Sequence, residues 1–227
     1  AIVGARNASS AGKSFAKKIS KELVEAGYIV VSGLARGIDA SAHEGALEGG
    51  TIGVVGNGID VFYPLENKNL QKLMFEKGLV ISEFPFESAP QTGHFPQRNR
   101  IISGLCRGVL VVEAALKSGS LITAHMALDQ GREVMAVPGS PLDPRCKGTN
   151  KLIKEGAKLI ETIDDVFAAF GDTFEKKPQK HHGNHQTFKI ALESDRASVL
   201  QSLSYTPIPV DQVVLELNLP PNTVRAI

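Results

Sequence analysis

Four short segments of the 227-residue sequence combine glycine or serine with arginine or lysine, the residue types that bind phosphate. The first, residues 4–13, follows an apolar run and leads into a helical pattern. Backbone N–H groups at the start of a helix favour an anion, and Arg6 adds a guanidinium that can hold two phosphate oxygens. Neither the spacing of a Walker A loop nor a G-x-G-x-x-G sequence occurs. The segment therefore predicts either phosphate binding or a tight turn with a surface arginine.

The second segment, residues 32–43, also leads from an apolar run into a helical pattern. Gly33 and Gly37 allow another group to approach the backbone closely. Asp39 and His43 are four residues apart and so share one helix face, where they form either an acid–base pair or a structural pair that pins the loop. We favour the structural interpretation.

The third and fourth segments are richer in cations and hydroxyl groups. Arg98 and Arg100 flank Asn99 where a proline-containing loop is expected to become a helix. Two guanidinium groups beside an amide suit phosphate or ribose, with contacts to carbonyl groups at a sheet edge or to carboxylates as the alternative. In the fourth segment a cation, two hydroxyl groups and N–H groups at a helix start predict a phosphate cradle, or a helix cap alone. Its residues are Lys117, Ser118, Gly119 and Ser120.

These segments require a scaffold of alternating strands and helices. Near-continuous apolar runs, typical of parallel strands covered on both faces, predict strands at 1–4, 28–32, 51–55, 79–82, 109–113 and 133–137. Amphipathic patterns predict helices at 14–26, 38–48, 67–76 and 120–130. The alternation predicts an α/β fold, an extended Rossmann-like, doubly wound parallel sheet. Because the carboxyl ends of parallel strands share one edge, we expect the four segments to form one basic groove there.

Composition excludes several classes of protein. Lys and Arg number 25 against 24 Asp and Glu, giving a net charge of +1, so any anion site must come from local arrangement. No apolar run approaches the roughly 18 residues that span a membrane. Cys106 and Cys146 lack the spacing of a zinc site, and free thiols indicate the cytoplasm. We therefore predict no metal, no cofactor and no membrane partner.

The strand–helix alternation stops near residue 171, which we predict as the end of the first domain. Residues 172–193 are polar and predict a linker, whose three histidines are interpreted as solvated rather than metal-binding. Residues 194–227 predict a partial, winged-helix-like domain, with a small helical protein-contact domain as the alternative. Both ends of the chain are expected to be truncated. The helices expected in the second domain are 196–202, 210–217 and one starting at 223.

Several motifs, in order, resemble the DNA-processing protein A (DprA, also called Smf) family over residues 1–160. They are SGLARGID (32–39) with Ala42-His43, NGID (57–60) with Tyr63-Pro64, FPQRNRII (95–102), KSGSLITA (117–124) and VPG (137–139). The resemblance implies a non-catalytic protein that binds single-stranded DNA without sequence specificity. It further implies that the protein protects DNA entering during natural transformation, loads the RecA recombinase onto it, and forms a homodimer.

The resemblance also gives the predicted residues roles. Arg6 and Lys117 would contact phosphates, and Arg98, Asn99 and Arg100 would shape the groove or bind DNA there. Since aromatic residues make up only 6% of the chain, we expect contacts with the DNA backbone to dominate and base preference to be small. Phe95 is the nearest candidate for stacking, although a core position is favoured. Backbone or hydroxyl donors to DNA would be Gly4, Ala5, Gly33, Ser118, Gly119 and Ser120.

Two other functions are compatible with the sequence. A nucleotide-binding or nucleotide-cleaving enzyme of a Rossmann-like group would use Glu113, or Asp39 with His43, as acid and base. Against it, the motifs supply no set of nucleophile, base and orienting residue. The second alternative is a protein-assembly module built on residues 194–227.

Overall fold

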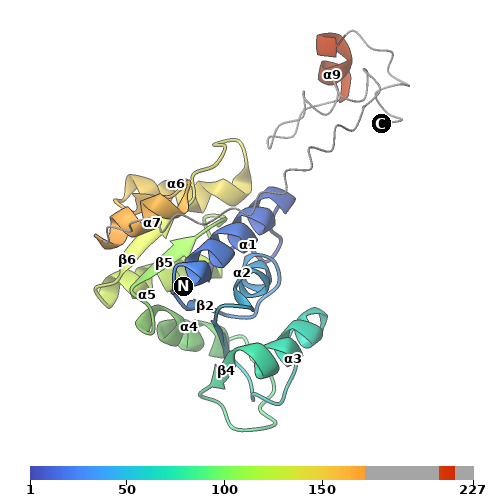
Figure 1. Ribbon diagram of the computed structural model, residues 1–227, viewed down its shortest axis with the longest axis vertical. Coiled ribbons are helices and arrows are strands. Elements are labelled where there is room, and N and C mark those ends of the chain that lie inside the picture. The colour runs from blue at the N-terminus through green and yellow to red at the C-terminus, as the bar shows by residue number, and fades with distance from the viewer. Residues whose placement is uncertain (172–209, 218–227) are drawn as a thin grey trace, which may run out of the picture. The chain divides into compact units, whose positions relative to one another are not determined.

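The computed structural model describes residues 1–171 and 210–217, which fall in two separate units (Figure 1). The strands of the first unit are β1 (Ile2–Val3), β2 (Val30–Ser32), β3 (Thr51–Val55), β4 (Leu79–Ser82), β5 (Gly108–Val111), β6 (Glu133–Ala136) and β7 (Lys158–Leu159). Its α-helices are α1 (Ser10–Glu25), α2 (Ile38–Ala46), α3 (Lys68–Lys77), α4 (His94–Gly104), α5 (Gly119–Asp129), α6 (Lys147–Lys154) and α7 (Ile163–Phe170). Short 3₁₀ helices are η1 (Leu65–Asn67) and η2 (Pro144–Cys146).

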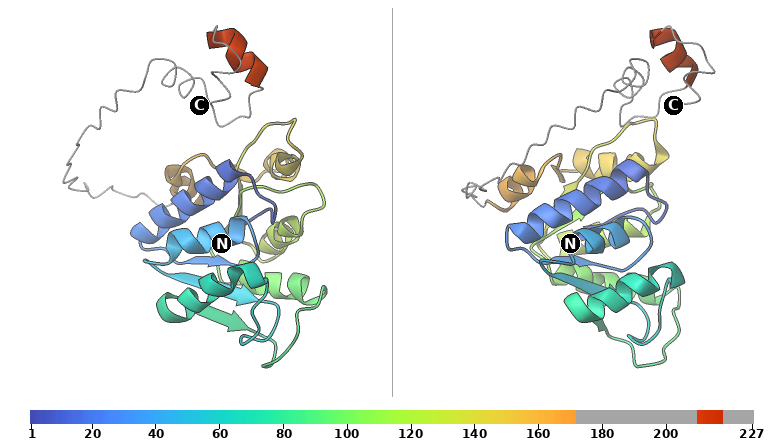
Figure 2. Two further views of the ribbon diagram at one scale, coloured as in Figure 1. Left: turned by 90° about the vertical axis from the view of Figure 1, so that its right-hand side faces the viewer. Right: turned by 45° about the vertical axis from the view of Figure 1, so that its right-hand side comes forward.

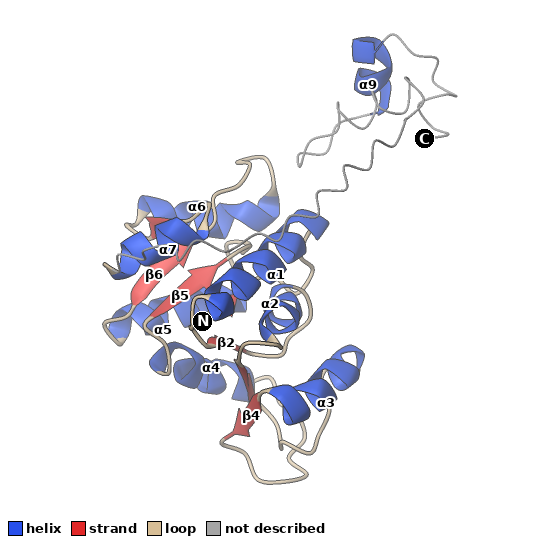
Figure 3. Cartoon of the chain, viewed as in Figure 1, coloured by secondary structure: helices blue, strands red, loops and turns tan. Residues whose placement is uncertain are grey.

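All described strands pair in parallel, in the orders β1-β5-β6-β7 and β2-β3-β4. The Ser32 hydroxyl donates to the Ile2 carbonyl at 2.6 Å and joins β2 to β1. The strands therefore follow one another as β4-β3-β2-β1-β5-β6-β7, with helices on either side (Figure 3). This confirms the doubly wound parallel sheet. The chain builds outward from β1 in one direction and later in the other, which places a crevice at the carboxyl ends of β1 and β5.

The core lies on both faces of the sheet because successive side chains of each strand point to opposite faces. Ile2, Val30 and Leu110 pack with α1, α2 and α7 on one face. Val3 and Val31 pack against α4, α5 and α6 on the other. Helices α1 and α2 lie side by side across the first face (Figure 2). The result is a three-layer arrangement in which every strand before a helix ends at the same edge.

The six predicted strands are confirmed, and the structure adds β7, α6 and α7, which the sequence patterns did not indicate. Helix α1 begins four residues earlier than predicted because Ser9 caps it, accepting the Gly12 N–H at 2.9 Å. Helix α4 begins at His94, so Pro96 lies in its first turn, where a proline is tolerated. Arg98 is therefore inside the helix and not at the predicted junction of loop and helix.

In the second unit the structure describes α9 (Val210–Leu217), which has the predicted bounds. Val213 is buried and Leu215 is exposed, as an amphipathic helix requires. The predicted linker and the helices predicted at 196–202 and 223–227 lie outside the described residues. Both cysteines of the first unit are buried and free. None of the described helices is long and apolar enough to cross a membrane.

Candidate nucleic-acid interface

The loop between β2 and α2 has an unusual backbone conformation. Leu34 has a φ of 55°, in the left-handed region that side chains rarely adopt, and Gly37 has a φ of 79°. A Cβ atom at Gly37 would lie 2.2 Å from the Ala5 carbonyl oxygen. The same oxygen accepts the Ile38 N–H at 3.2 Å. The close approach that Gly37 permits is therefore to the chain itself, and it locks the β2–α2 loop onto the β1–α1 loop.

Buried side chains hold this loop in place. The Leu34 N–H donates to Nε2 of His43 at 3.3 Å, and the Leu34 carbonyl accepts from the Asn67 side chain at 2.8 Å. Nδ1 of His43 lies 2.7 Å from the Thr51 hydroxyl, which donates to the Val30 carbonyl. His43 therefore donates from Nδ1 and accepts at Nε2 as a neutral ring. Burial, and secondarily the charge of Arg98, lower its pKa to about 3.

Arg98 and Asp39 form the buried centre of the same network. Arg98 is 5% exposed, and its Nη1 donates to the carbonyl groups of Gly33, at 2.8 Å, and Val54. Burial lowers the pKa of Arg98 to about 10, although Asp39 favours its charged form and Arg6 opposes it. Burial also raises the pKa of the Asp39 carboxyl, against the effect of Arg98. Arg98 thus shapes the ends of β2 and β3, one of its two predicted roles.

One expectation for this loop needs correction. The resemblance implies that the Gly33 N–H donates to DNA, whereas in the structure it donates to the Asp39 carboxylate at 3.1 Å. The preferred interpretation of Asp39 and His43, a structural pair that pins the loop, agrees with the structure. Asp39 accepts the backbone N–H of Gly33, and His43 accepts that of Leu34.

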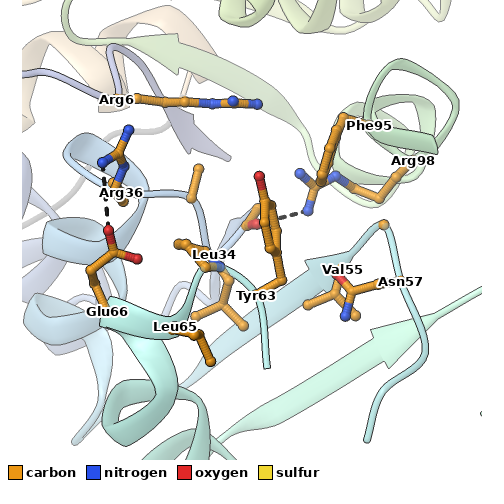
Figure 4. A pocket seen from close by; sticks show the side chains of 14 residues that line it. Arg6, Leu34, Arg36, Val55, Asn57, Tyr63, Leu65, Glu66, Phe95 and Arg98 are labelled. Atoms are coloured by element: carbon orange, nitrogen blue, oxygen red, sulfur yellow. Dashed lines mark hydrogen bonds and ion pairs between the residues drawn. The ribbon is translucent and has the colours of Figure 1, made fainter. Parts of the chain in front are cut away.

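A pocket of about 400 Å³ opens above this network, at the carboxyl ends of β1, β2 and β3 (Figure 4). Three arginines, Arg6, Arg36 and Arg98, line it together with the aromatic rings of Tyr63 and Phe95. The Phe95 ring stacks on Tyr63 with centroids 5.6 Å apart, and the Arg6 guanidinium lies 5.5 Å from the Phe95 centroid. We call this site the arginine pocket.

The lip of the arginine pocket also carries a negative charge. Arg36 and Glu66 approach to 3.5 Å, and both side chains are more than half exposed (Figure 4). An exposed pair of this kind adds little to stability. The Glu66 carboxylate therefore already accompanies the charge of Arg36 at the lip of the pocket.

The loop that starts α5 is organised differently. Ser118 caps the helix, accepting the Ser120 N–H at 3.4 Å, and the two hydroxyl groups lie 2.7 Å apart. Lys117 is exposed, and no acidic group of the described residues forms an ion pair with it. A Cβ atom at Gly119 would meet nothing within 4 Å. We call residues 116–120 the lysine loop.

The lysine loop borders its own hollow of about 230 Å³, formed by α5 and α6. Arg6 and Lys117 therefore follow neighbouring strands, β1 and β5, at the same edge but line different hollows. The single groove predicted from the sequence stays a prediction. Arg6 and Arg98 both line the arginine pocket.

The remaining predicted residues lie around these two sites. A Cβ atom at Gly4 would come within 2.7 Å of Ile38, so this glycine is needed for packing. Asn99 is half-buried on α4, and Arg100 is exposed and paired with Glu83. Contacts of these residues with DNA stay predictions.

Glu113 lies between the two sites and is 6% exposed. One carboxylate oxygen accepts the Ser9 N–H at 2.9 Å and the other accepts the Ser9 hydroxyl at 2.5 Å. Gly12 makes room for the carboxylate, because a Cβ atom there would lie 2.7 Å from it. Glu113 thus faces the start of α1. Within residues 1–171 and 210–217, no three His, Cys, Asp or Glu side chains gather as a metal site.

The parallel, doubly wound sheet, with an arginine-lined pocket at its carboxyl edge, defines a Rossmann-like protein. Residues 1–171 match the family model for DNA recombination-mediator protein A, and residues 188–227 match the DprA winged helix domain. The chain therefore belongs to the DprA family.

Relatives agree with this assignment. DNA processing protein DprA of Bacillus subtilis is 50% identical over 168 residues, covering 73% of this chain and 57% of the relative. The Streptococcus pneumoniae DNA processing protein DprA is 50% identical over 172 residues, covering 75% of this chain and 61% of the relative. The chain thus spans about three fifths of the length of these relatives.

Solved structures show the same fold. DprA from Streptococcus pneumoniae superposes with a TM-score of 0.69 at 48% identity, covering 74% of this chain and 59% of that one. The structure of DNA processing protein A from Helicobacter pylori concerns its single-stranded DNA binding mode. It superposes with a TM-score of 0.69 at 32% identity, covering 74% of this chain and 78% of that one. A molybdenum cofactor carrier protein from Chlamydomonas reinhardtii shares the fold alone, at 17% identity and a TM-score of 0.50.

Proposed function

We propose that this chain binds single-stranded DNA at the arginine pocket. One observation carries the proposal: the Arg6 guanidinium lies over the Phe95 ring, which stacks on Tyr63, inside a pocket that Arg36 also lines. Cations for the backbone beside aromatic rings for the bases are the combination that single-strand binding uses. The related Helicobacter pylori protein, studied for its binding of single-stranded DNA, supports the proposal.

In this arrangement cationic side chains would bind the DNA backbone, and an aromatic side chain would bind a base. Arg6 and Arg36 would hold phosphate oxygens, and Lys117 would contact a further phosphate as a point charge. Tyr63 is 39% exposed, so a base can stack on its ring. A paired base inside a duplex cannot reach it, which gives preference for single strands without preference for sequence. Stacking thus adds to the backbone contacts that the sequence alone predicted.

The wider role follows from the family. We propose that the protein acts in the cytoplasm as a homodimer, protects single-stranded DNA and loads the RecA recombinase onto it during natural transformation or recombination. We also propose that it does so without catalysis. Supporting this, the candidate acid and base groups Glu113, Asp39 and His43 are all buried and bound to the chain's own backbone.

The test is fluorescence anisotropy with labelled oligothymidylate over a range of salt concentrations. We expect Arg6→Ala and Lys117→Ala each to weaken binding and to reduce the salt slope by about 0.7, the value for one lost phosphate contact on a single strand. Lys21→Ala is the matched control, because Lys21 is an exposed cation in the second half of α1, away from this edge. Unchanged slopes for both test variants would contradict the phosphate contacts.

Two further ligands separate the alternatives. We expect Tyr63→Ala to weaken binding of oligothymidylate but not of an abasic oligonucleotide of the same length. Equal losses for both ligands would contradict stacking. Hydrolysis of a mononucleotide, without binding of any oligonucleotide, would favour the nucleotide-cleaving enzyme.

A further inference from the structure

Two loops bring the cations Arg6 and Lys117 to the sheet edge. The buried carboxylate of Glu113 links these two loops by hydrogen bonds. Arg6 lies three residues before Ser9 in the β1–α1 loop, and Lys117 lies four residues after Glu113 in the β5–α5 loop. Glu113 accepts both the backbone N–H and the hydroxyl of Ser9, across 104 residues of sequence. No other described side-chain hydrogen bond links these two loops among residues 1–171.

The two ends of this link are fixed by the fold. The Ser9 hydroxyl also accepts the Gly12 N–H at 2.9 Å, so Ser9 is held by the first turn of α1. On the other side, the residues flanking Glu113 are bonded to the backbone. Val112 N–H donates to the Val3 carbonyl at 3.1 Å, and Ala114 N–H donates to the Arg145 carbonyl at 2.7 Å. The Glu113 side chain therefore holds the start of α1 at a set distance from the end of β5.

A carboxylate is well suited to this position. The N-terminal end of a helix favours negative charge, and hydrogen bonds to an ionised acceptor are about twice as strong as neutral ones. The carboxyl ends of β1 and β5 are also where Rossmann-like folds bind the anionic groups of their ligands. Here Glu113, whose carboxylate occupies the space left by Gly12, supplies the anion from within the chain.

We propose that Glu113 is a positioning residue that sets the separation of Arg6 and Lys117, so that both contact phosphates of one DNA strand. The inference rests on the proposed function. The inference predicts that replacing Glu113 weakens DNA binding. Charge alone would predict the reverse, because removing a negative charge near the DNA lessens the repulsion between them.

The DNA-binding test compares Glu113→Ala, Glu113→Gln and Ser9→Ala by anisotropy with oligothymidylate. We expect Glu113→Ala to weaken binding about tenfold and to reduce the salt slope by about 0.7, as one of two phosphate contacts is lost. Glu113→Gln keeps the volume of the side chain, and its affinity for oligothymidylate should fall severalfold. Ser9→Ala keeps the negative charge of Glu113, and its affinity should fall two- to threefold. Glu44→Gln removes an exposed carboxylate on α2 and should bind as well as the unmodified chain, or better.

A second measurement does not depend on DNA. Spin labels at Asn7→Cys and Leu116→Cys, both exposed positions, report the distance between the loops, since the native cysteines are buried. We expect a narrow distance distribution that broadens when Glu113→Ala is added. If Glu113→Ala unfolds the chain, Ser9→Ala gives the same readout.

The outcomes separate the two proposals. Variants that fold and bind DNA as tightly as the unmodified chain, or more tightly, would overturn the role of Glu113 and leave the proposed function intact. An unchanged distance distribution would overturn it too. A chain that binds no single-stranded DNA, yet shows the broadening, would instead refute the proposed function.

Discussion

The arginine pocket and the lysine loop lie at the same edge of the sheet but are built in opposite ways. In the arginine pocket each guanidinium already has a protein partner: Arg98 holds carbonyl groups, Arg36 meets Glu66, and Arg6 lies over Phe95. In the lysine loop the cation of Lys117 is exposed and has no such partner among the described residues. In the first region the buried charge of Arg98 fixes the shape of the pocket, and Arg6 and Arg36 each have a protein partner beside them. In the second region the charge of Lys117 lies on a long, flexible side chain and has no such partner in the part of the chain that the structure describes.

The largest effect expected from this difference comes from removing the buried cation. Arg98→Met would remove the charge that favours the ionised form of buried Asp39 and would take a donor from two buried carbonyl groups, so we expect the free energy of unfolding to fall by about 3–5 kcal/mol. The neighbouring Arg100→Met is the matched control, because its ion pair with Glu83 is exposed and should contribute at most about 1 kcal/mol. Urea unfolding measures both. Equal losses would show that Arg98 does not hold the pocket.

The next effect is a dependence of stability on pH. The pKa of His43 is about 3 in the folded chain against 6.5 for a free histidine, so between these values only the unfolded state takes up the proton. The contribution of His43 is therefore complete above about pH 6.5 and falls by about 1 kcal/mol per pH unit as the pH drops. His43→Leu should flatten this part of the profile in urea unfolding at pH 4.5 to 7. His125→Gln, at an exposed position on α5, should keep the slope of the unmodified chain.

A pair of glycine variants compares the two regions directly. At Gly119 an added Cβ atom meets no atom within 4 Å, so Gly119→Val should change stability by no more than about 0.5 kcal/mol. We expect it to weaken single-strand binding several-fold, because DNA can no longer approach the backbone. Gly37→Val should instead unfold the loop, since its Cβ would lie 2.2 Å from the Ala5 oxygen. Thermal unfolding and anisotropy separate the two; unchanged DNA binding by Gly119→Val would remove the lysine loop from the site.

The smallest expected effect is a gain. Glu66→Gln frees Arg36 at the lip of the arginine pocket, so oligothymidylate should bind two- to threefold more tightly at low salt. Glu48→Gln frees Lys77 on α3 in the same way and is the control for a general change of charge. Equal gains for both variants would mean that Arg36 has no special access to the ligand.

The sequence predicted the scaffold well because buried parallel strands have continuous apolar runs. It missed β7, whose two residues, Lys158 and Leu159, form no such run. It also placed the start of α1 too late, since the apolar pattern begins inside the helix and the cap at Ser9 carries no apolar signal.

The site was predicted only in part, for physical reasons that differ from residue to residue. A buried arginine such as Arg98 has the same letter as an exposed one, and only packing distinguishes them. The stack of Phe95 on Tyr63 joins residues that are distant in sequence, although both belong to motifs that the sequence displayed. The link from Glu113 to Ser9 carries no local signal at all, because it depends on the pairing of β5 with β1.

The junction between β1 and β2 has a further consequence. These two strands meet without a ladder of main-chain hydrogen bonds, and the Ser32 hydroxyl bonded to the Ile2 carbonyl takes its place. The sheet therefore consists of two halves, and Arg6 projects from one while Arg36 projects from the other. A nucleic acid bound by both arginines would hold the two halves of the sheet together. Its binding would then slow amide hydrogen exchange in β1 and β2, the strands on either side of the junction.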